Sequence, residues 1–163
     1  MKKKIVLMLT VIMLIGLAGC GKNQINIKET GTSDNNEQMV QNIYENKRTE
    51  VKQKISEIKE RLPETSAEDK GTCGSKAKWY YKDNTLIIYG EGVITEDTWH
   101  KSNIVINTVV IDSGITKLGN NMFSGLGSEV GKNIENFYIA DGLEEIGSST
   151  FVNCDCLSEI VLP

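Results

Sequence analysis

The sequence VVIDSGITKLGNNMF at residues 109–123 recurs as FYIADGLEEIGSSTF at residues 137–151, with an offset of 28 residues throughout. Aliphatic residues, two glycines and a closing phenylalanine coincide in the two copies. A third copy begins with LSEIVLP at residues 157–163 and matches residues 134–140 at an offset of 23. We therefore predict repeats at about residues 106–133, 134–156 and 157–163, the last of them partial.

Each repeat contains a short strand, a glycine turn, a second short extended stretch and a segment with one phenylalanine. A single unit of this size cannot cover its apolar face, whereas stacked units share one continuous core. We therefore expect Phe123 and Phe151 to stack in a column through the interior. The prediction fails if the two rings lie in separate environments.

The pattern Ile-x-x-Gly-(Ile/Leu)-x-x-(Leu/Ile)-Gly-x-x-x-Phe, followed by a strand that ends at Leu162-Pro163, resembles the BspA-like leucine-rich repeats of bacterial surface proteins. Upstream, residues 71–74, Trp79, residues 85–92 and Trp99 resemble the segment that often precedes such repeats. The resemblance covers about residues 71–163. It implies a mainly β, short leucine-rich-repeat solenoid with an N-terminal β-hairpin cap. It also implies an extracellular location, with binding or adhesion rather than catalysis.

The cap is expected to be a hairpin, because Asp83-Asn84 is a turn signal between two strand-like runs. The second run, residues 85–89, should end at the glycines of residues 90–92. Trp79 and Trp99 are interpreted as core anchors of this region, although exposed tryptophans would also stack on a sugar.

A helix is predicted over residues 37–63, where Val51, Ile55, Ile58 and Leu62 form a stripe with helical spacing. Lys47 and Arg48 interrupt that stripe. Two readings stay open: a spacer helix whose thin apolar edge rests on the domain, and a short coiled coil that pairs with a second copy or a partner. Polar residues 20–36 and 64–70 are predicted to be a flexible tether and a linker.

The N-terminus has three lysines, a short apolar run and the sequence Leu17-Ala18-Gly19-Cys20. A run from Ile5 to Gly19 spans about 22 Å as a helix, too short for a hydrocarbon core of about 30 Å. The four residues resemble the lipobox of bacterial lipoproteins. That resemblance implies a signal peptide at residues 1–19, cleavage between Gly19 and Cys20, and a lipid anchor with palmitate-type acyl chains on Cys20. The chain is then extracytoplasmic and bound to the bacterial cell membrane.

The 163-residue chain has a formal net charge of −4, which becomes −7 when the leader and its three lysines are removed. An acidic surface argues against nucleic-acid binding, which requires clustered lysine and arginine.

Enzyme chemistry finds little support, because His100 is the sole histidine and no catalytic triad can be assembled. We expect no enzyme activity, cofactor or metal site. Cys154-x-Cys156 lacks a second ligand pair for zinc, and Cys154 aligns with Leu126 at an inward apolar position. Cys73, Cys154 and Cys156 should be mostly free, with a bridge to Cys73 as the minor alternative.

These features predict a surface lipoprotein whose repeats bind a protein or glycan. The alternatives are a structural or self-assembling envelope spacer, an accessory part of an envelope enzyme, and a truncated fragment of a longer repeat protein. Self-association would use the open end of the repeats or the helix.

Overall fold

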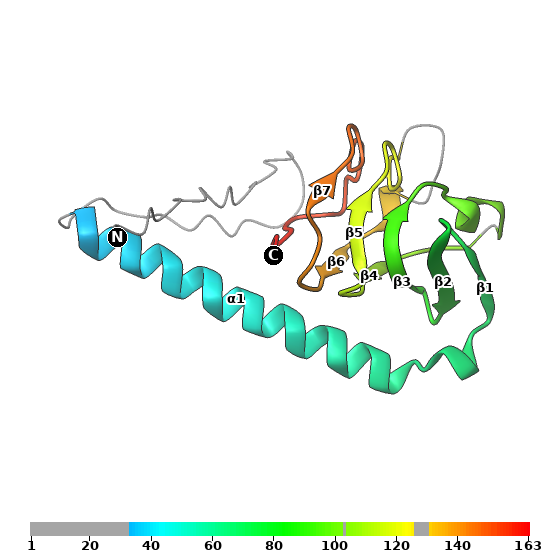
Figure 1. Ribbon diagram of the computed structural model, residues 1–163, viewed down its shortest axis with the longest axis horizontal. Helices are drawn as coiled ribbons and strands as arrows, with labels where there is room; N and C mark the ends of the chain where they lie inside the picture. The colour runs from blue at the N-terminus through cyan, green and yellow to red at the C-terminus, as the bar shows by residue number, and fades with distance from the viewer. Residues whose placement is uncertain (1–32, 103, 126–130) are drawn as a thin grey trace, which may run out of the picture.

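The computed structural model describes residues 33–102, 104–125 and 131–163. They form one long helix followed by a mainly β region (Figure 1). Gly19 and Cys20, with the predicted leader and anchor, lie outside the described residues. The described helix and strands are α1 (Ser33–Arg61), β1 (Asp69–Thr72), β2 (Lys76–Lys82), β3 (Thr85–Ile94), β4 (Thr108–Ile111), β5 (Ile115–Leu118), β6 (Asn136–Ile139) and β7 (Glu145–Ile146), with short 3-10 turns η1 (Glu64–Ser66), η2 (Thr98–Ser102) and η3 (Gly131–Asn133).

The predicted hairpin is confirmed by the antiparallel pair β2–β3, in which Lys82 faces Thr85 across the turn. Asp83 and Asn84 both have positive φ angles, 47° and 55°, which matches the two-residue turn that suits twisted strands. The linker prediction is partly wrong, because Asp69 and Lys70 belong to β1, which adds a third antiparallel strand beside β2.

β3 does not end at the glycines of residues 90–92, contrary to expectation. Gly90 and Gly92 take φ angles of 99° and 85°, and the strand continues through a bulge to Ile94. Its first half pairs in parallel with β4 and its second half pairs in parallel with β5. The glycines therefore redirect one strand across two parts of the sheet, because only glycine adopts these angles without strain.

The repeats lie side by side as parallel strands in the register that the sequence predicts. Thr108 pairs with Asn136, and Lys117 pairs with Glu145, both at the offset of 28 residues. The repeats begin earlier in the chain than the predicted start at about residue 106, however. Thr85 of β3 pairs with Thr108 of β4 in the same parallel fashion. The second hairpin strand is therefore also the first strand of the repeat array.

The phenylalanine column is confirmed, and it has one more ring than predicted. The rings of Phe123 and Phe151 stack with centroids 6.4 Å apart and planes 9° apart. Trp99 stacks on the other side of Phe123, at 5.4 Å and 12°. Trp79 and Trp99 are both buried, which confirms them as core anchors. Three successive turns of chain thus share one aromatic interior.

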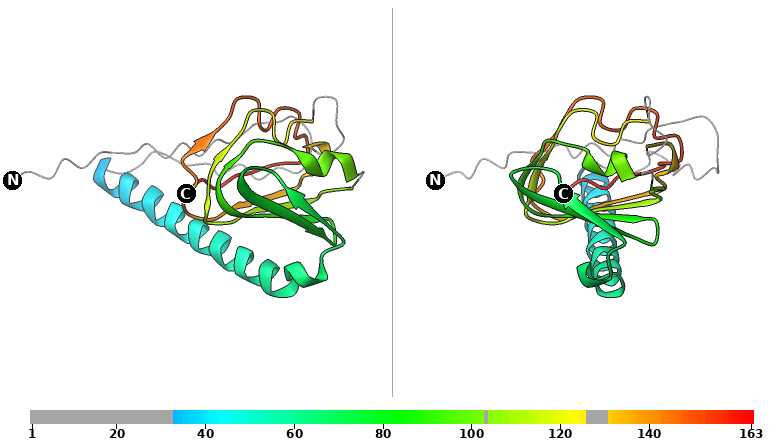
Figure 2. Two further views of the ribbon diagram at one scale, coloured as in Figure 1. Left: turned by 45° about the vertical axis from the view of Figure 1, so that its right-hand side comes forward. Right: turned by 90° about the vertical axis from the view of Figure 1, so that its right-hand side faces the viewer.

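Helix α1 covers the face of the sheet that points away from the aromatic column. It extends beyond the sheet at its N-terminal end (Figures 1 and 2). The four stripe residues, Val51, Ile55, Ile58 and Leu62, are buried against one row of side chains that are neighbours across four adjacent strands. Stripe residues recur about every 5 Å along a helix, and strands are about 4.8 Å apart, so a helix that crosses the strands can place one residue over each. The row consists of Tyr80, Ile87, Val110 and Tyr138.

The third repeat copy differs from expectation, because residues 157–163 form no strand. The described helix is also longer than predicted and begins at Ser33 rather than at residue 37. Among the described residues, no helix has the length and hydropathy to cross a bilayer. The described chain is mainly β with one helix and an open sheet, consistent with a leucine-rich repeat fold.

Candidate functional site

Among the strands that the structure describes, β6 is the last of the order β1-β2-β3-β4-β6, so no described strand pairs with one of its edges, the open edge. The amide of Asn136 donates to the carbonyl of the residue before β4 at 3.1 Å, and the amide of Ala140 donates to the carbonyl of the last residue of β4 at 2.9 Å. In a parallel ladder alternate residues bond to opposite sides, so the backbone groups of Phe137 and Ile139 face the open edge. This edge is where the sheet can accept another group.

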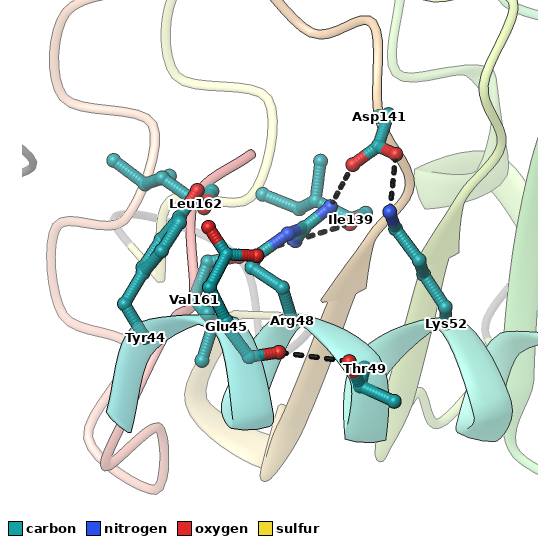
Figure 3. A network of polar contacts seen from close by, with 9 residues as sticks. All are labelled: Tyr44, Glu45, Arg48, Thr49, Lys52, Ile139, Asp141, Val161 and Leu162. Carbon is teal, nitrogen blue, oxygen red and sulfur yellow. Dashed lines mark hydrogen bonds and ion pairs between the residues drawn. The ribbon is translucent and has the colours of Figure 1, made fainter. Parts of the chain in front are cut away.

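Arg48 of α1 occupies part of that edge (Figure 3). Its side chain is 4% exposed and donates to the carbonyl oxygens of Ile139 and Val161, at 2.9 and 3.0 Å. It also donates to the Asp141 carboxylate at 2.7 Å, and Lys52 pairs with the other oxygen of that carboxylate. Hydrogen bonds from Lys52 and then from Arg48 lower the pKa of Asp141. The buried guanidinium is therefore well satisfied.

The repeat explains why an arginine is needed at this place. The carbonyl of Ile88 accepts from the amide of Asp112, and the carbonyl of Ile111 accepts from the amide of Ala140, both at 2.9 Å. In the third copy the residue aligned with Ala140 is Pro163, which has no N–H to donate. Arg48 supplies the missing donor to the equivalent carbonyl, that of Ile139.

The C-terminal segment, residues 157–163, is held by α1 instead of by β6. The hydroxyl of Tyr44 donates to the carbonyl of Leu162 at 3.1 Å, and Lys47 forms an ion pair with Glu159. Between the described residues of β6 and of this segment, no backbone hydrogen bond is formed. The open edge of β6 thus lies next to a segment that does not complete its ladder.

A groove of about 390 Å³ lies between α1, β6 and this segment. Val51 and Tyr138 supply apolar surface, and Phe137 also lines it. Its two lysines are engaged, Lys47 with Glu159 and Lys54 with Glu57. Its remaining acids, Glu50 and Glu135, are exposed and form no ion pair within the described part of the chain. The groove offers apolar surface and negative charge, which suits recognition.

The histidine considered from sequence lies away from this edge. His100 follows Trp99 in η2, and its Nδ1 lies 2.7 Å from a carboxylate oxygen of Asp97. No nucleophile is paired with it among the described residues. The pair is therefore a local contact between η2 and the residue that precedes it.

The three cysteines of the described chain are free, and two of them are buried. Burial raises the pKa of the Cys73 thiol to about 12 and that of Cys154 to about 11. The Cys154 thiol donates to the carbonyl of Phe123 at 3.1 Å, which confirms its inward position. Cys156 is exposed. In the described residues, no three histidine, cysteine or acidic side chains are grouped to hold a metal ion.

Sequence reasoning missed Arg48 as part of the site and treated it as a break in the stripe. Residues 48, 51, 55, 58 and 62 nevertheless have one continuous 3-4-3-4 spacing. An arginine in phase with a buried stripe must find acceptors, because burying an unpaired charge is costly. Together with the proline at position 163, that spacing was the available signal.

No protein-family model and no curated protein matches the chain. A similar solved structure is that of a leucine-rich repeat protein from Eubacterium ventriosum ATCC 27560, with 25% sequence identity and a TM-score of 0.45. The match covers 52% of this chain and 23% of that one. This chain thus spans less than a quarter of the length of the protein that it resembles.

Proposed function

We propose that this chain is a bacterial surface lipoprotein, anchored through acylated Cys20, whose repeats form a short solenoid that binds a protein or glycan ligand. The observation that carries the proposal is the groove of about 390 Å³ beside the open edge of β6. Grooves of this size are common for ligand sites, and a free strand edge is a common site of protein recognition. No catalytic role is included in the proposal.

The anchoring half of the proposal rests on Leu17-Ala18-Gly19-Cys20. Cells that express the chain or its Cys20→Ala variant are grown with a radioactive fatty acid and then fractionated. The unaltered chain should carry label and sediment with membranes, whereas the variant should carry none. Equal labelling of the two would contradict the assignment of Cys20.

The binding half is tested by presenting the purified chain to arrays of glycans and of extracellular proteins. We expect saturable binding to members of one class. Silence on both arrays would contradict the proposal, whatever the result of the labelling experiment.

A self-assembling envelope component is the second candidate, and the unpaired edge of β6 is the observation that favours it. Sedimentation velocity over a range of concentrations separates the two functions. A self-assembling chain grows in sedimentation coefficient as its concentration rises, whereas a binding module does not.

A further inference from the structure

We propose that the C-terminal segment, residues 157–163, closes onto the open edge of β6 as the next parallel strand, and that the groove exists only while this segment is open. The segment then regulates access to the groove, which is an autoinhibitory contact within the chain. Its effect on a ligand rests on the proposed binding function. Its closure as a strand is a separate property that can be tested without a ligand.

The side chains of the C-terminal segment already lie as those of a strand in register with β6. Ile160 belongs to the core cluster, as does Phe137, 23 positions earlier. Val161 packs on the side of α1, as does Tyr138, also 23 positions earlier. Successive side chains that point to opposite faces are a property of strands. Closure therefore needs a shift of the backbone and no exchange of buried side chains.

The backbone bonds of this added strand are the ones that Arg48 and Pro163 prevent. In the parallel ladder the amide of Ile139 faces the segment, and the offset of 23 would give it the carbonyl of Val161. That carbonyl accepts from Arg48 instead, at 3.0 Å. Arg48 also donates to the carbonyl of Ile139, which the amide of residue 163 would reach if that residue were not a proline. These two residues together hold the segment open.

The two elements that closure would join are two walls of the groove. Residues 135–138 line it from β6, and Ser158, Glu159 and Val161 line it from the C-terminal segment. Neighbouring strands are about 4.8 Å apart, which leaves no room for a ligand between them. Closure of the segment and occupation of the groove therefore exclude one another. A ligand binds only the open fraction of the molecules, so its apparent affinity falls as that fraction falls.

The experiment measures amide hydrogen exchange by NMR in the full-length chain in mild detergent. In the unaltered chain the amides of Phe137 and Ile139 should exchange faster than that of Ala140, which is bonded to β4. Pro163→Ala supplies the missing N–H, so we expect it to slow both amides relative to Ala140 by up to about tenfold, as for one hydrogen bond gained. The matched control is Pro63→Ala, which changes the other proline of the chain and should leave these rates unchanged.

Arg48→Met is the second variant, because it removes the donor that competes for the carbonyl of Val161. It should slow the same two amides, and the comparison with Ala140 corrects for a change in overall stability. If Pro163→Ala does not fold, this variant decides. Slow exchange of both amides in the unaltered chain would show that the segment is already closed. That result, or exchange that neither variant slows, would overturn the inference.

The arrays of glycans and extracellular proteins, repeated with Pro163→Ala, test the effect on the groove. Signals of the unaltered chain should weaken in this variant by up to about tenfold and persist in Pro63→Ala. Unchanged signals together with slowed exchange would overturn the mutual exclusion of ligand and closed segment. Silence of the unaltered chain on both arrays would contradict the proposed function, whereas hydrogen exchange would still decide whether the segment closes.

Discussion

The contribution of Arg48 to the free energy of unfolding can be separated into an effect of its charge and an effect of its geometry. Its guanidinium joins two carbonyls and one carboxylate, and hydrogen bonds from charged donors are worth about 1.5–3 kcal/mol. We predict that Arg48→Met lowers the free energy of unfolding by about 2–3 kcal/mol. Arg48→Lys should lose a large part of this, because an ammonium cannot span the same fork of acceptors. Urea titrations measure both changes.

Asp141→Asn is the matched control for Arg48, since it leaves both carbonyl contacts in place. The Asp141 side chain is 60% exposed, so we expect a loss below about 1 kcal/mol. Because its pKa is lowered, this contribution is present above its ordinary pKa of 3.8 and is lost as the pH falls through the lowered value. A loss for Asp141→Asn as large as that for Arg48→Met would show that the ion pair, and not the carbonyl contacts, carries the effect.

The three described thiols should differ sharply in reactivity. Cys156 is exposed, whereas Cys73 and Cys154 are buried with pKa values raised to about 12 and about 11. Because the thiolate is the reactive form, we predict that Ellman's reagent at pH 8 modifies Cys156 promptly and the other two only after unfolding. The Cys20→Ala chain is used so that the anchor residue does not contribute. Prompt reaction of a second thiol would contradict the buried placement of Cys73 and Cys154.

At the scale of elements, the repeat and the hairpin could be predicted because their signals are local. Matching glycines and phenylalanines set the offset of 28, and Asp83-Asn84 sets the turn. The first turn of the array was missed because its ring is Trp99 where later copies have phenylalanine. The residues of β3 that pair with β4 also lie 23 positions before their partners, whereas the later copies are 28 positions apart. Stacking depends on the shape and position of the ring, which a pattern of identical letters does not capture.

The aromatic column gives a prediction for the elements that it joins. Phe123 is fully buried between Trp99 and Phe151, whereas Phe151 is partly buried at the end of the column. We predict that Phe123→Ala lowers the free energy of unfolding by about 3–5 kcal/mol and that Phe151→Ala costs less, because a central cavity cannot collapse as easily. Chemical denaturation of the two variants checks the order, and the reverse order would contradict a continuous column.

The helix gives a second prediction at this scale. Ile55 is 7% exposed and packs on the sheet, whereas Met39, on the overhanging part of α1, is 44% exposed. We predict that Ile55→Ala lowers the free energy of unfolding by about 2–4 kcal/mol without changing the sedimentation coefficient. Met39→Ala should change stability by less than about 0.5 kcal/mol. If Ile55→Ala instead dissociated a dimer, the stripe would serve the coiled coil that the sequence left open.

At the scale of the whole molecule, the groove could not be predicted from sequence. Glu50 and Glu135 are 85 positions apart, and they line one groove because α1 lies across the strands with its stripe in step with them. This placement depends on the agreement between the spacing of the stripe residues along the helix and the spacing of the strands. Neither the helix nor the strands reveal that agreement alone. The acylation that we propose for Cys20 is the opposite case, because the sequence that suggests it is four adjacent residues and needs no fold.

The pH dependence of the free energy of unfolding is the remaining prediction for the whole molecule. Burial raises the pKa of Cys73 to about 12, and burial with the hydrogen bond to Glu64 raises that of Tyr89 to about 12. The unfolded chain loses these protons near the ordinary values of 9.0 and 10.0, while the folded chain keeps them. The contribution of these two groups to stability is therefore present below about pH 9 and falls steadily toward pH 12, because the folded state binds more protons in that window. Urea midpoints measured from pH 7 to pH 11 should follow this decline. Cys73→Ala should make the decline shallower, because Tyr89 and Cys154 still contribute to it, and Cys156→Ala, which removes an exposed thiol, should leave it unchanged. A midpoint that stays constant up to pH 11, or an equal slope in both variants, would show that the buried thiol does not link folding to proton binding.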